Sequence, residues 1–206
     1  LLLLPGFLFL FTFFVLPIIN LAQTSTQTPL AGGDTGQYEQ TLRFANYLNA
    51  FTENKEQFAR SFFFALCATI LALAIAYPLA YAIAFKAGRL KNFLLVLVVA
   101  PFFVSFLLRT VAWKQILGEE GFVVPGLRTL GIISESTTLT STSFAVVMGM
   151  TYNFLPFMTL PLYASLERID PRTMEASGDL YANGLTTFRK VTLPLSMPGV
   201  VAGTLL

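Results

Sequence analysis

Five polar or aromatic residues stand within or at the ends of long apolar runs, where their side chains could line a path for a solute. They are Arg109, Trp113, Tyr152, Asn153 and Tyr163. Polar side chains inside a membrane are costly and are therefore functional candidates, and aromatic faces attract cations. Simpler roles stay open: Arg109 can snorkel to the outer surface, Trp113 can anchor at the interface, and Asn153 can bond two helices together.

The chain lacks the residues that enzymes most often use for catalysis and metal binding. The 206 residues include no histidine and a single cysteine, Cys67, which is expected to pack as a small apolar residue. Zinc sites and Ser-His or Cys-His catalysis are therefore not expected. The GxxxxGK[ST] phosphate loop is also missing from the sequence. We predict that the chain is not an enzyme, holds no metal or cofactor, and leaves ATP to another subunit.

The composition predicts a membrane as solvent. Hydrophobic residues make up 55% of the chain and charged residues 12%, and the mean hydropathy is +0.69. Soluble domains carry about twice that share of charge. The net charge of +2 and the lack of a basic, aromatic-rich cluster give no support to nucleic-acid binding.

Long apolar runs predict an all-helical, polytopic transmembrane bundle with four spans and the start of a fifth. A helix needs about 20 apolar residues to cross a bilayer core. The predicted spans cover residues 1–22, 61–85, 93–113, 143–166 and 195–206. Because the first residue is not Met and the last ones are apolar, we expect further chain beyond both ends.

Prolines inside the spans each remove a backbone donor and predict kinks, which occur in moving and in static bundles. They are Pro78, Pro101, Pro156 and Pro161.

Basic residues orient the spans. The loop 86–92 has three basic residues and no acid, and the loop 167–194 has four basic residues. The segments 23–60 and 114–142 have five between them over a greater length. Lys and Arg concentrate in short cytoplasmic loops. We therefore predict that 86–92 and 167–194 are cytoplasmic and that 23–60 is extracytoplasmic.

The loop 167–194 is expected to contain two short helices. Asp170 can cap a helix over 171–181 that begins with proline, and Asn183 can cap a second helix over 184–191. The residue before Pro194 resists the helical conformation, so we expect the second helix to end there. Leu185 and Phe188 share one face of it, which either binds a partner or packs back on the chain's own helix ends.

The loop resembles the EAA signature of permease subunits of binding-protein-dependent ABC importers. That signature is Glu-Ala-Ala, three residues, Gly, nine residues, an apolar residue, one residue and Leu-Pro. Here residues 175–177 are Glu-Ala-Ser, Val191 takes the apolar position, and 193–194 are Leu-Pro. Two residues depart from the signature: Ser177 replaces an alanine, and Tyr181 replaces the glycine, with Gly184 three residues later.

Three longer stretches look like permeases of the spermidine/putrescine group within this family. They are SFLLRTVAWKQILGEEGFV, LPFMTLPLYASLERIDPRTMEA and KVTLPLSMPGVVAGTLL. The likeness covers most of residues 61–206, the expected permease domain, whereas 1–22 agrees in character only. It implies the type I ABC importer permease fold, with about six spans in the full chain, forming half of a translocation path.

The resemblance also implies what the loop 167–194 does. It would dock into a groove on a cytoplasmic ATPase dimer, with Glu175 and Asp179 at the polar edge of the contact. Leu185 and Phe188 would be its apolar anchor. The coupling residues implied in this way are Glu175, Ala176, Ser177, Asp179, Gly184, Leu185, Phe188 and Pro194. A second permease and an extracytoplasmic binding protein complete the implied partners.

The implied solute is a polyamine, although the spans 61–85, 93–113 and 143–166 contain no carboxylate to hold one. Glu119 and Glu120 could attract a cation at the outer mouth, or dock a binding protein. Permeases for ferric iron, sulfate, phosphate or sugars share the architecture, so these solutes stay open. The same apolar spans would also suit an ATP-independent carrier or channel, or a membrane anchor without transport.

Overall fold

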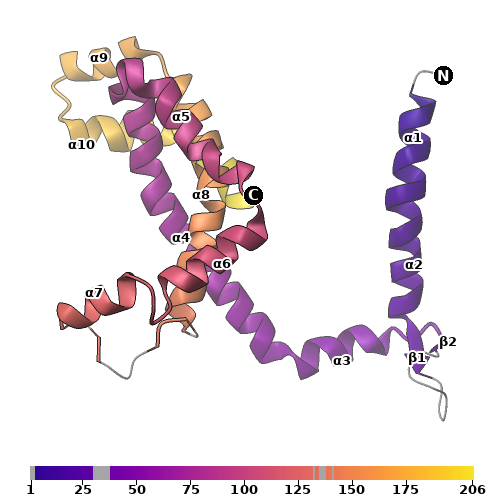
Figure 1. Ribbon diagram of the computed structural model, residues 1–206. Helices are drawn as coiled ribbons and strands as arrows, with labels where there is room; N and C mark the ends of the chain where they lie inside the picture. The colour runs from indigo at the N-terminus through magenta and orange to yellow at the C-terminus, as the bar shows by residue number, and fades with distance from the viewer. Residues whose placement is uncertain (1–2, 30–37, 132, 135–137, 141) are drawn as a thin grey trace. The chain divides into compact units, whose positions relative to one another are not determined.

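The computed structural model describes residues 3–29, 38–131, 133–134, 138–140 and 142–206. It is predominantly helical, as expected, and separates into two compact units, Leu1–Arg60 and Ser61–Leu206 (Figure 1). Each unit is described by itself.

The first unit begins with the expected first span. The helix α1 (Leu4–Leu10), the π-helical turn η1 (Phe11–Val15) and α2 (Leu16–Ser25) form one apolar helix of 22 residues, long enough to cross a membrane. The π turn lies directly before the Leu-Pro pair that opens α2. Because proline has no N–H to donate, a wider turn at this point accommodates the missing bond.

The segment that follows contains two short strands, which an all-helical prediction did not anticipate. β1 (Gln27–Pro29) pairs antiparallel with β2 (Tyr38–Gln40), and α3 (Ala45–Glu53) comes next. The Asn46 side chain donates hydrogen bonds to the carbonyls of Ser25 and Gln27 at 3.1 and 2.9 Å. These bonds join α3 to the end of α2 and to β1.

The second unit is built on two long helices. α4 (Lys55–Tyr81) continues into the π-helical turn η2 (Ala82–Lys86), giving an apolar helix of 32 residues, and α8 (Ser143–Glu167) has 25 residues. Every fourth residue of α4 from Ala68 to Ala80 is a buried alanine. Small residues on one face let helices approach closely, and this face packs in a core with Leu162 and Leu166 of α8.

The predicted third span is wrong as a single helix. After the 3-10 turn η3 (Gly88–Leu90), the chain forms α5 (Lys91–Val99), the 3-10 turn η4 (Ala100–Phe103) and α6 (Phe106–Ile116), with a bend of 97° before α6. Pro101 lies in η4, and Val104 is extended with φ −101° and ψ 133°. The missing proline donor and the extended residue end one helix before the next begins. The short helix α7 (Val123–Thr129) follows α6.

The loop 167–194 forms α9 (Pro171–Asp179) and α10 (Gly184–Thr187), as expected. The prediction that Pro194 ends the second helix is wrong, because α10 runs through the π-helical turn η5 (Phe188–Thr192) into α11 (Leu193–Leu205). The N–H of Leu193 bonds to the carbonyl of Phe188, five residues back. This wider π turn lets the helix continue although Pro194 has no N–H to donate. Thr192 and Ser196, on either side of the proline, are both buried.

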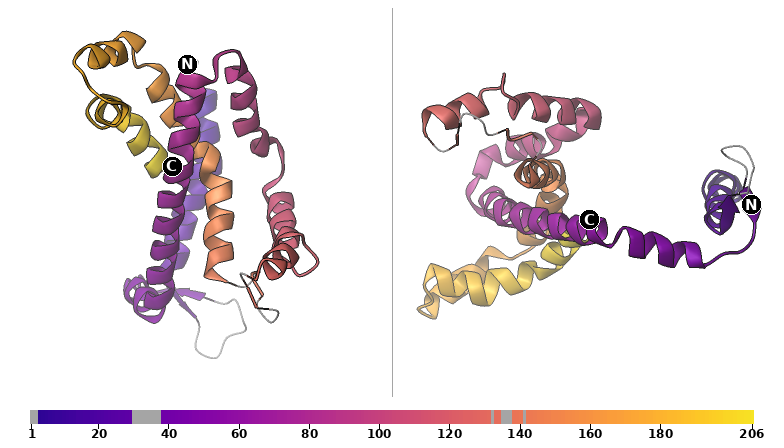
Figure 2. Two further views of the ribbon diagram at one scale, coloured as in Figure 1. Left: turned by 90° about the vertical axis from the view of Figure 1, so that its left-hand side faces the viewer. Right: turned by 90° about the horizontal axis from the view of Figure 1, so that it is seen from below.

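The two predicted cytoplasmic loops lie at the same end of the second unit. η2, η3, α9 and α10 gather at one end, and α7 lies at the other (Figures 1 and 2). This placement agrees with alternation of the spans, and the side of the membrane on which that end lies stays a prediction. α11 packs along α8, which places the apolar start of the predicted fifth span within the bundle.

Candidate functional site

Both short helices of the loop 167–194 begin where the capping residues predict. The Asp170 carboxylate accepts a hydrogen bond from the backbone N–H of Arg172 at 2.9 Å, with proline at the first helical position. The Asn183 side-chain oxygen accepts from the N–H of Thr186 at 2.8 Å. These side chains satisfy donors that a helix start otherwise leaves free, so the ends of α9 and α10 are defined by sequence.

The turn between the two helices is a Schellman motif with tyrosine at its left-handed position. The N–H of Tyr181 donates to the carbonyl of Gly178 at 2.9 Å, and that of Ala182 donates to Ser177 at 3.1 Å. Tyr181 has a φ of +55°. Glycine is the usual residue at this position because it has no Cβ to crowd the backbone. The turn that glycine would form is thus made here with tyrosine.

Ser177 joins the two short helices. It is buried, its hydroxyl donates to the carbonyl of Met174 at 2.7 Å, and its oxygen lies 2.8 Å from the Thr187 hydroxyl. Because the single serine proton points at Met174, Thr187 is the donor in the second bond. The serine that replaces an alanine of the signature therefore has a structural role that its small size alone did not predict.

Replacing Ser177 with alanine is expected to loosen α9 from α10. The change removes two hydrogen bonds of a buried hydroxyl and leaves the Thr187 proton without its acceptor, at a cost of about 1–2 kcal/mol. Hydrogen exchange of the backbone amides in 171–187 should become faster by about tenfold, while exchange in α8 stays as it is. Thr187→Ser, which keeps the donor, is the control, and unchanged exchange in Ser177→Ala would contradict this link.

The apolar side chains of the loop divide into exposed and packed ones. Leu180 is 81% exposed, Tyr181 98% and Leu185 74%. Phe188 is half-buried, and its ring meets Tyr77 of α4 edge-on, with ring centres 5.5 Å apart and planes at 83°. Of the two residues predicted to share a partner-binding face, Leu185 is thus free for a partner and Phe188 packs back on the chain.

Tyr77 connects the loop to the long helices, and sequence reasoning missed it. Its hydroxyl lies 2.7 Å from that of Ser196 in α11, which itself donates to the carbonyl of Leu193 at 3.0 Å. Tyr77 is therefore the donor to Ser196. A tyrosine beside Pro78 within a long apolar run was the available signal, because a phenol in a membrane needs a partner.

The remaining loop candidates are exposed. Glu175 and Asp179 lie four residues apart on α9, so they share one face, and neither forms an ion pair with the described part of the chain. Ala176, Gly184 and Pro194 are exposed as well. The loop therefore presents an acidic helix face next to an apolar tip, formed by the exposed side chains of Leu180, Tyr181 and Leu185.

An ion pair lies beside Tyr163, near the end of α8 that leads into this loop. Lys91, at the start of α5, lies 2.5 Å from the Glu167 carboxylate and 5.4 Å from the centre of the Tyr163 ring. Tyr163 is buried there, 11 residues along α8 from Tyr152, which is about 16 Å of helix. The structure thus does not bring Tyr163 together with the other predicted path residues.

Trp113 and Tyr152 lie against each other, with Arg109 one helical turn before Trp113 on α6 and Asn153 directly after Tyr152 on α8. The Trp113 and Tyr152 rings stack with centres 5.9 Å apart and planes within 2°. The indole N–H donates to the carbonyl of Ala145 at 3.4 Å, and a Cβ on Gly149 would lie 3.1 Å from the indole nitrogen. Glycine at 149 therefore gives the indole room to lie flat against α8.

Arg109 and Asn153 each have buried polar atoms that lack hydrogen-bond partners among the described residues. These atoms are Nε and Nη1 of Arg109 and Oδ1 of Asn153. The amide of Asn153 donates to Gly149 of its own helix at 2.9 Å, so its donor does not tie two helices together. The Arg109 guanidinium lies 5.9 Å from the centre of the Phe106 ring. Buried unpaired groups of this kind are available to a polar ligand.

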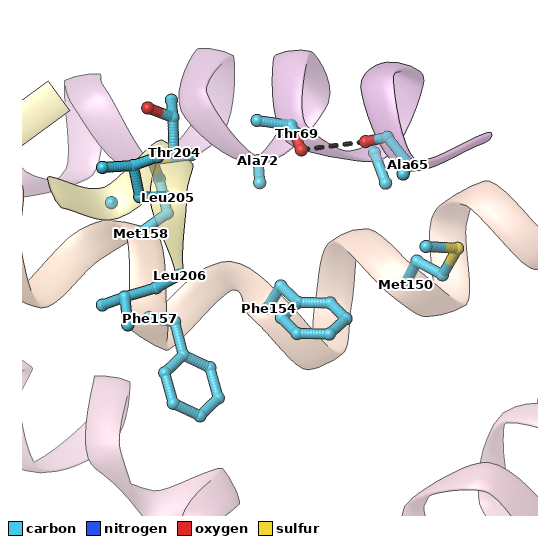
Figure 3. Close-up of a pocket in the computed structure, with 12 residues that line it drawn as sticks. Ala65, Thr69, Ala72, Met150, Phe154, Phe157, Met158, Thr204, Leu205 and Leu206 are labelled. Carbon is cyan, nitrogen blue, oxygen red and sulfur yellow. Dashed lines mark hydrogen bonds between the residues drawn. The ribbon is translucent and has the colours of Figure 1, made fainter. Parts of the chain in front are cut away.

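The second unit contains several hollows, of which two lie near predicted path residues or the outer acidic pair. An apolar one of about 230 Å³ is lined by small residues of α4, the Phe154 and Phe157 side chains of α8, and the end of α11 (Figure 3). A wider one of about 790 Å³ lies at the C-terminal end of α6 and is lined by residues that include Lys114, Glu119 and Glu120. Glu119 also lies 3.8 Å from Arg128, so part of its charge is balanced within the chain.

Known proteins resemble this chain over most of its length. Residues 76–206 match the family described as binding-protein-dependent transport system inner membrane component. The spermidine/putrescine transport system permease protein PotB of Haemophilus influenzae is 39% identical over 170 residues, 82% of this chain and 59% of that protein.

Two Escherichia coli proteins are also similar. The spermidine/putrescine permease protein PotB is 39% identical over 142 residues, which is 69% of this chain and 52% of that protein. The inner membrane ABC transporter permease protein YdcU is 32% identical over 177 residues, 80% of this chain and 56% of that protein. The chain spans about half the length of the curated relatives it matches. The matched region has the type I ABC permease fold, and the chain belongs to the binding-protein-dependent transport system inner membrane component family.

Proposed function

We propose that the chain is a permease subunit of an ATP-driven importer for the polyamines spermidine and putrescine, forming half of the translocation path. The observation that carries this proposal is its 39% identity, over 82% of its length, to a spermidine/putrescine permease protein. The proposed partners are a second permease, a cytoplasmic ATPase dimer and an extracytoplasmic binding protein. The permease domain is residues 61–206, and ATP is bound and hydrolysed by the ATPase.

The loop 167–194 is the proposed coupling loop, and its internal contacts suit it to transmit movement. Ser177 joins α9 to α10, and Phe188 and Ser196 join η5 and α11 to Tyr77 of α4. A movement of the loop tip is therefore transmitted to α4 and α11 through packed side chains. Conformational coupling requires such contiguous contacts between elements that move together.

The stacked pair Trp113 and Tyr152 is the proposed contact for a polyamine on its way through the membrane. Aromatic faces attract ammonium groups, and Tyr152 is exposed on one side. Glu119 and Glu120 concentrate cations at the hollow that follows α6. The predicted spans 61–85, 93–113 and 143–166 carry no carboxylate. The binding protein and the second permease therefore share the selection of the solute.

Uptake into proteoliposomes tests the proposed solute. The assembled transporter, with its ATPase and binding protein, is expected to take up radiolabelled spermidine only when ATP is supplied to the ATPase side. Excess putrescine should compete, whereas ferric iron, sulfate, phosphate and glucose should not. Uptake that is insensitive to putrescine but blocked by one of the other solutes would replace the polyamine with that solute, and uptake without ATP would indicate a carrier.

Replacing Tyr152 with leucine is expected to raise the KM for spermidine about fivefold, because one cation–π contact is worth roughly 1 kcal/mol. Tyr152→Phe keeps the ring and should transport normally. Phe144→Leu, at another exposed aromatic residue of α8, is the matched control. An equal KM in native protein and Tyr152→Leu would remove this residue from the path.

A further inference from the structure

Tyr181 holds a backbone conformation that disfavours its own side chain. Its φ is +55° at the left-handed position of the Schellman motif between α9 and α10. For a residue with a Cβ this conformation is strained, whereas glycine adopts it freely. Glycine at 181 would form the same turn with less strain.

No side-chain contact with the described residues offsets this strain. Tyr181 is 98% exposed, and within that part of the chain its side chain makes no hydrogen bond or ring contact. Strained residues persist where the surroundings or a function require them, so an observed outlier is a reason to look for a function. Since the described surroundings do not require this tyrosine, the strained conformation is a reason to look for a contact with a partner.

The surface around Tyr181 indicates what that outside contact is. Leu180 and Leu185, 81% and 74% exposed, complete an apolar tip with Tyr181. The connection between α9 and α10 lies at the edge of the second unit (Figure 1). Charges of both signs border this tip: Glu175 and Asp179 on α9, and Arg189 and Lys190 on η5, where Leu185 lines a shallow hollow with the two basic residues.

We propose that Tyr181 is a docking anchor of the coupling loop, with its ring inserted into an apolar groove of the ATPase subunit. The identity of the partner rests on the proposed function, and the anchoring side chain is the new element. Tyrosine combines a large apolar face with a polar tip at a small entropic cost and is enriched among residues that dominate interfaces. An anionic lipid surface would attract Arg189 and Lys190 but repel Glu175 and Asp179, whereas the polar rim of a protein interface can pair charges of both signs, which favours a protein as the occupant.

Tyr181→Gly separates anchoring from folding. The assembled permease pair, held in nanodiscs, is titrated with the isolated ATPase subunit, and its melting temperature is measured in parallel. Tyr181→Gly is expected to bind the ATPase at least about tenfold more weakly, the loss typical of an interface anchor, with no fall in melting temperature. Tyr181→Asn, which tolerates the left-handed conformation, should weaken binding equally, and Tyr181→Phe should bind normally.

Leu42 provides a matched control. It is the other described non-glycine residue with positive φ, at 49°, and it is 63% exposed on the segment before α3. Leu42→Gly relieves the same kind of strain and should leave ATPase binding unchanged. Native affinity in Tyr181→Gly would overturn the anchor and leave the proposed function intact. Failure of the native assembly to bind the ATPase at all would overturn the proposed function itself.

Discussion

Leucine in place of Gly199 is expected to disrupt the packing of α11 on α8. A Cβ at this position would lie 2.7 Å from the carbonyl oxygen of Pro161 and 2.6 Å from the Ser165 hydroxyl, closer than atoms of folded proteins approach. One turn later, a Cβ at Gly203 would lie 3.2 Å from the carbonyl oxygen of Met158. Glycines four residues apart let two membrane helices touch through their backbones. A side chain here forces the helices apart.

The expected size of this effect is a fall of about 5–10 °C in the melting temperature of the purified assembly, since overpacking costs about 1–3 kcal/mol. Transport should fall with it, because α11 carries the Ser196 contact to Tyr77. Val201→Leu, at an exposed position on the same helix, is the control and should melt like the native protein. An unchanged melting temperature in Gly199→Leu would show that the two helices do not meet at this glycine.

Aspartate in place of Leu185 is expected to abolish binding of the ATPase. Leu185 is 74% exposed, so the substitution leaves the folding of the chain undisturbed. If the leucine is buried in a groove of the partner, the new carboxylate must enter that groove without a counterion, which costs several kcal/mol. Affinity for the ATPase should therefore fall by at least about a hundredfold, and ATP-driven spermidine uptake should stop.

Leu130 is the control for this second experiment. It is 73% exposed and follows α7, at the end of the second unit opposite α9 and α10 (Figure 1). Leu130→Asp introduces the same charge at equal exposure and should leave ATPase binding as it is. Equal affinities of Leu185→Asp and native protein would remove Leu185 from the interface.

Composition and local rules predicted most of the helical framework. The predicted runs 1–22, 61–85 and 143–166 correspond to the continuous helices Leu4–Ser25, Lys55–Lys86 and Ser143–Glu167, because every backbone group in a membrane span must be bonded within its own helix. Asp170 and Asn183 marked the starts of α9 and α10 because a helix start needs acceptors for its free N–H groups. These features depend on near neighbours in sequence, which is why pattern alone could find them.

Two local details and one distant contact were not predictable in this way. Pro101 indicated a kink, but the 97° bend also depends on the extended Val104, which no propensity indicated. Pro194 indicated a helix end, whereas a π turn lets the helix pass through it. The contact of Phe188 with Tyr77 joins residues more than 100 positions apart, so periodicity could place Phe188 on a face but could not name what that face meets.

The coupling of the loop 167–194 to an ATPase is tested most directly by reversible cross-linking at its tip. In a Cys67→Ala background, Leu185→Cys is joined through a reducible linker to a cysteine in the groove of the ATPase, and ATP-driven uptake is measured before and after reduction. We predict a cross-link that forms from the cytoplasmic side, stops spermidine uptake and releases it on reduction. Labelling of Leu185→Cys by an impermeant thiol reagent from the extracytoplasmic side, or full uptake with the ATPase absent, would contradict the proposed coupling.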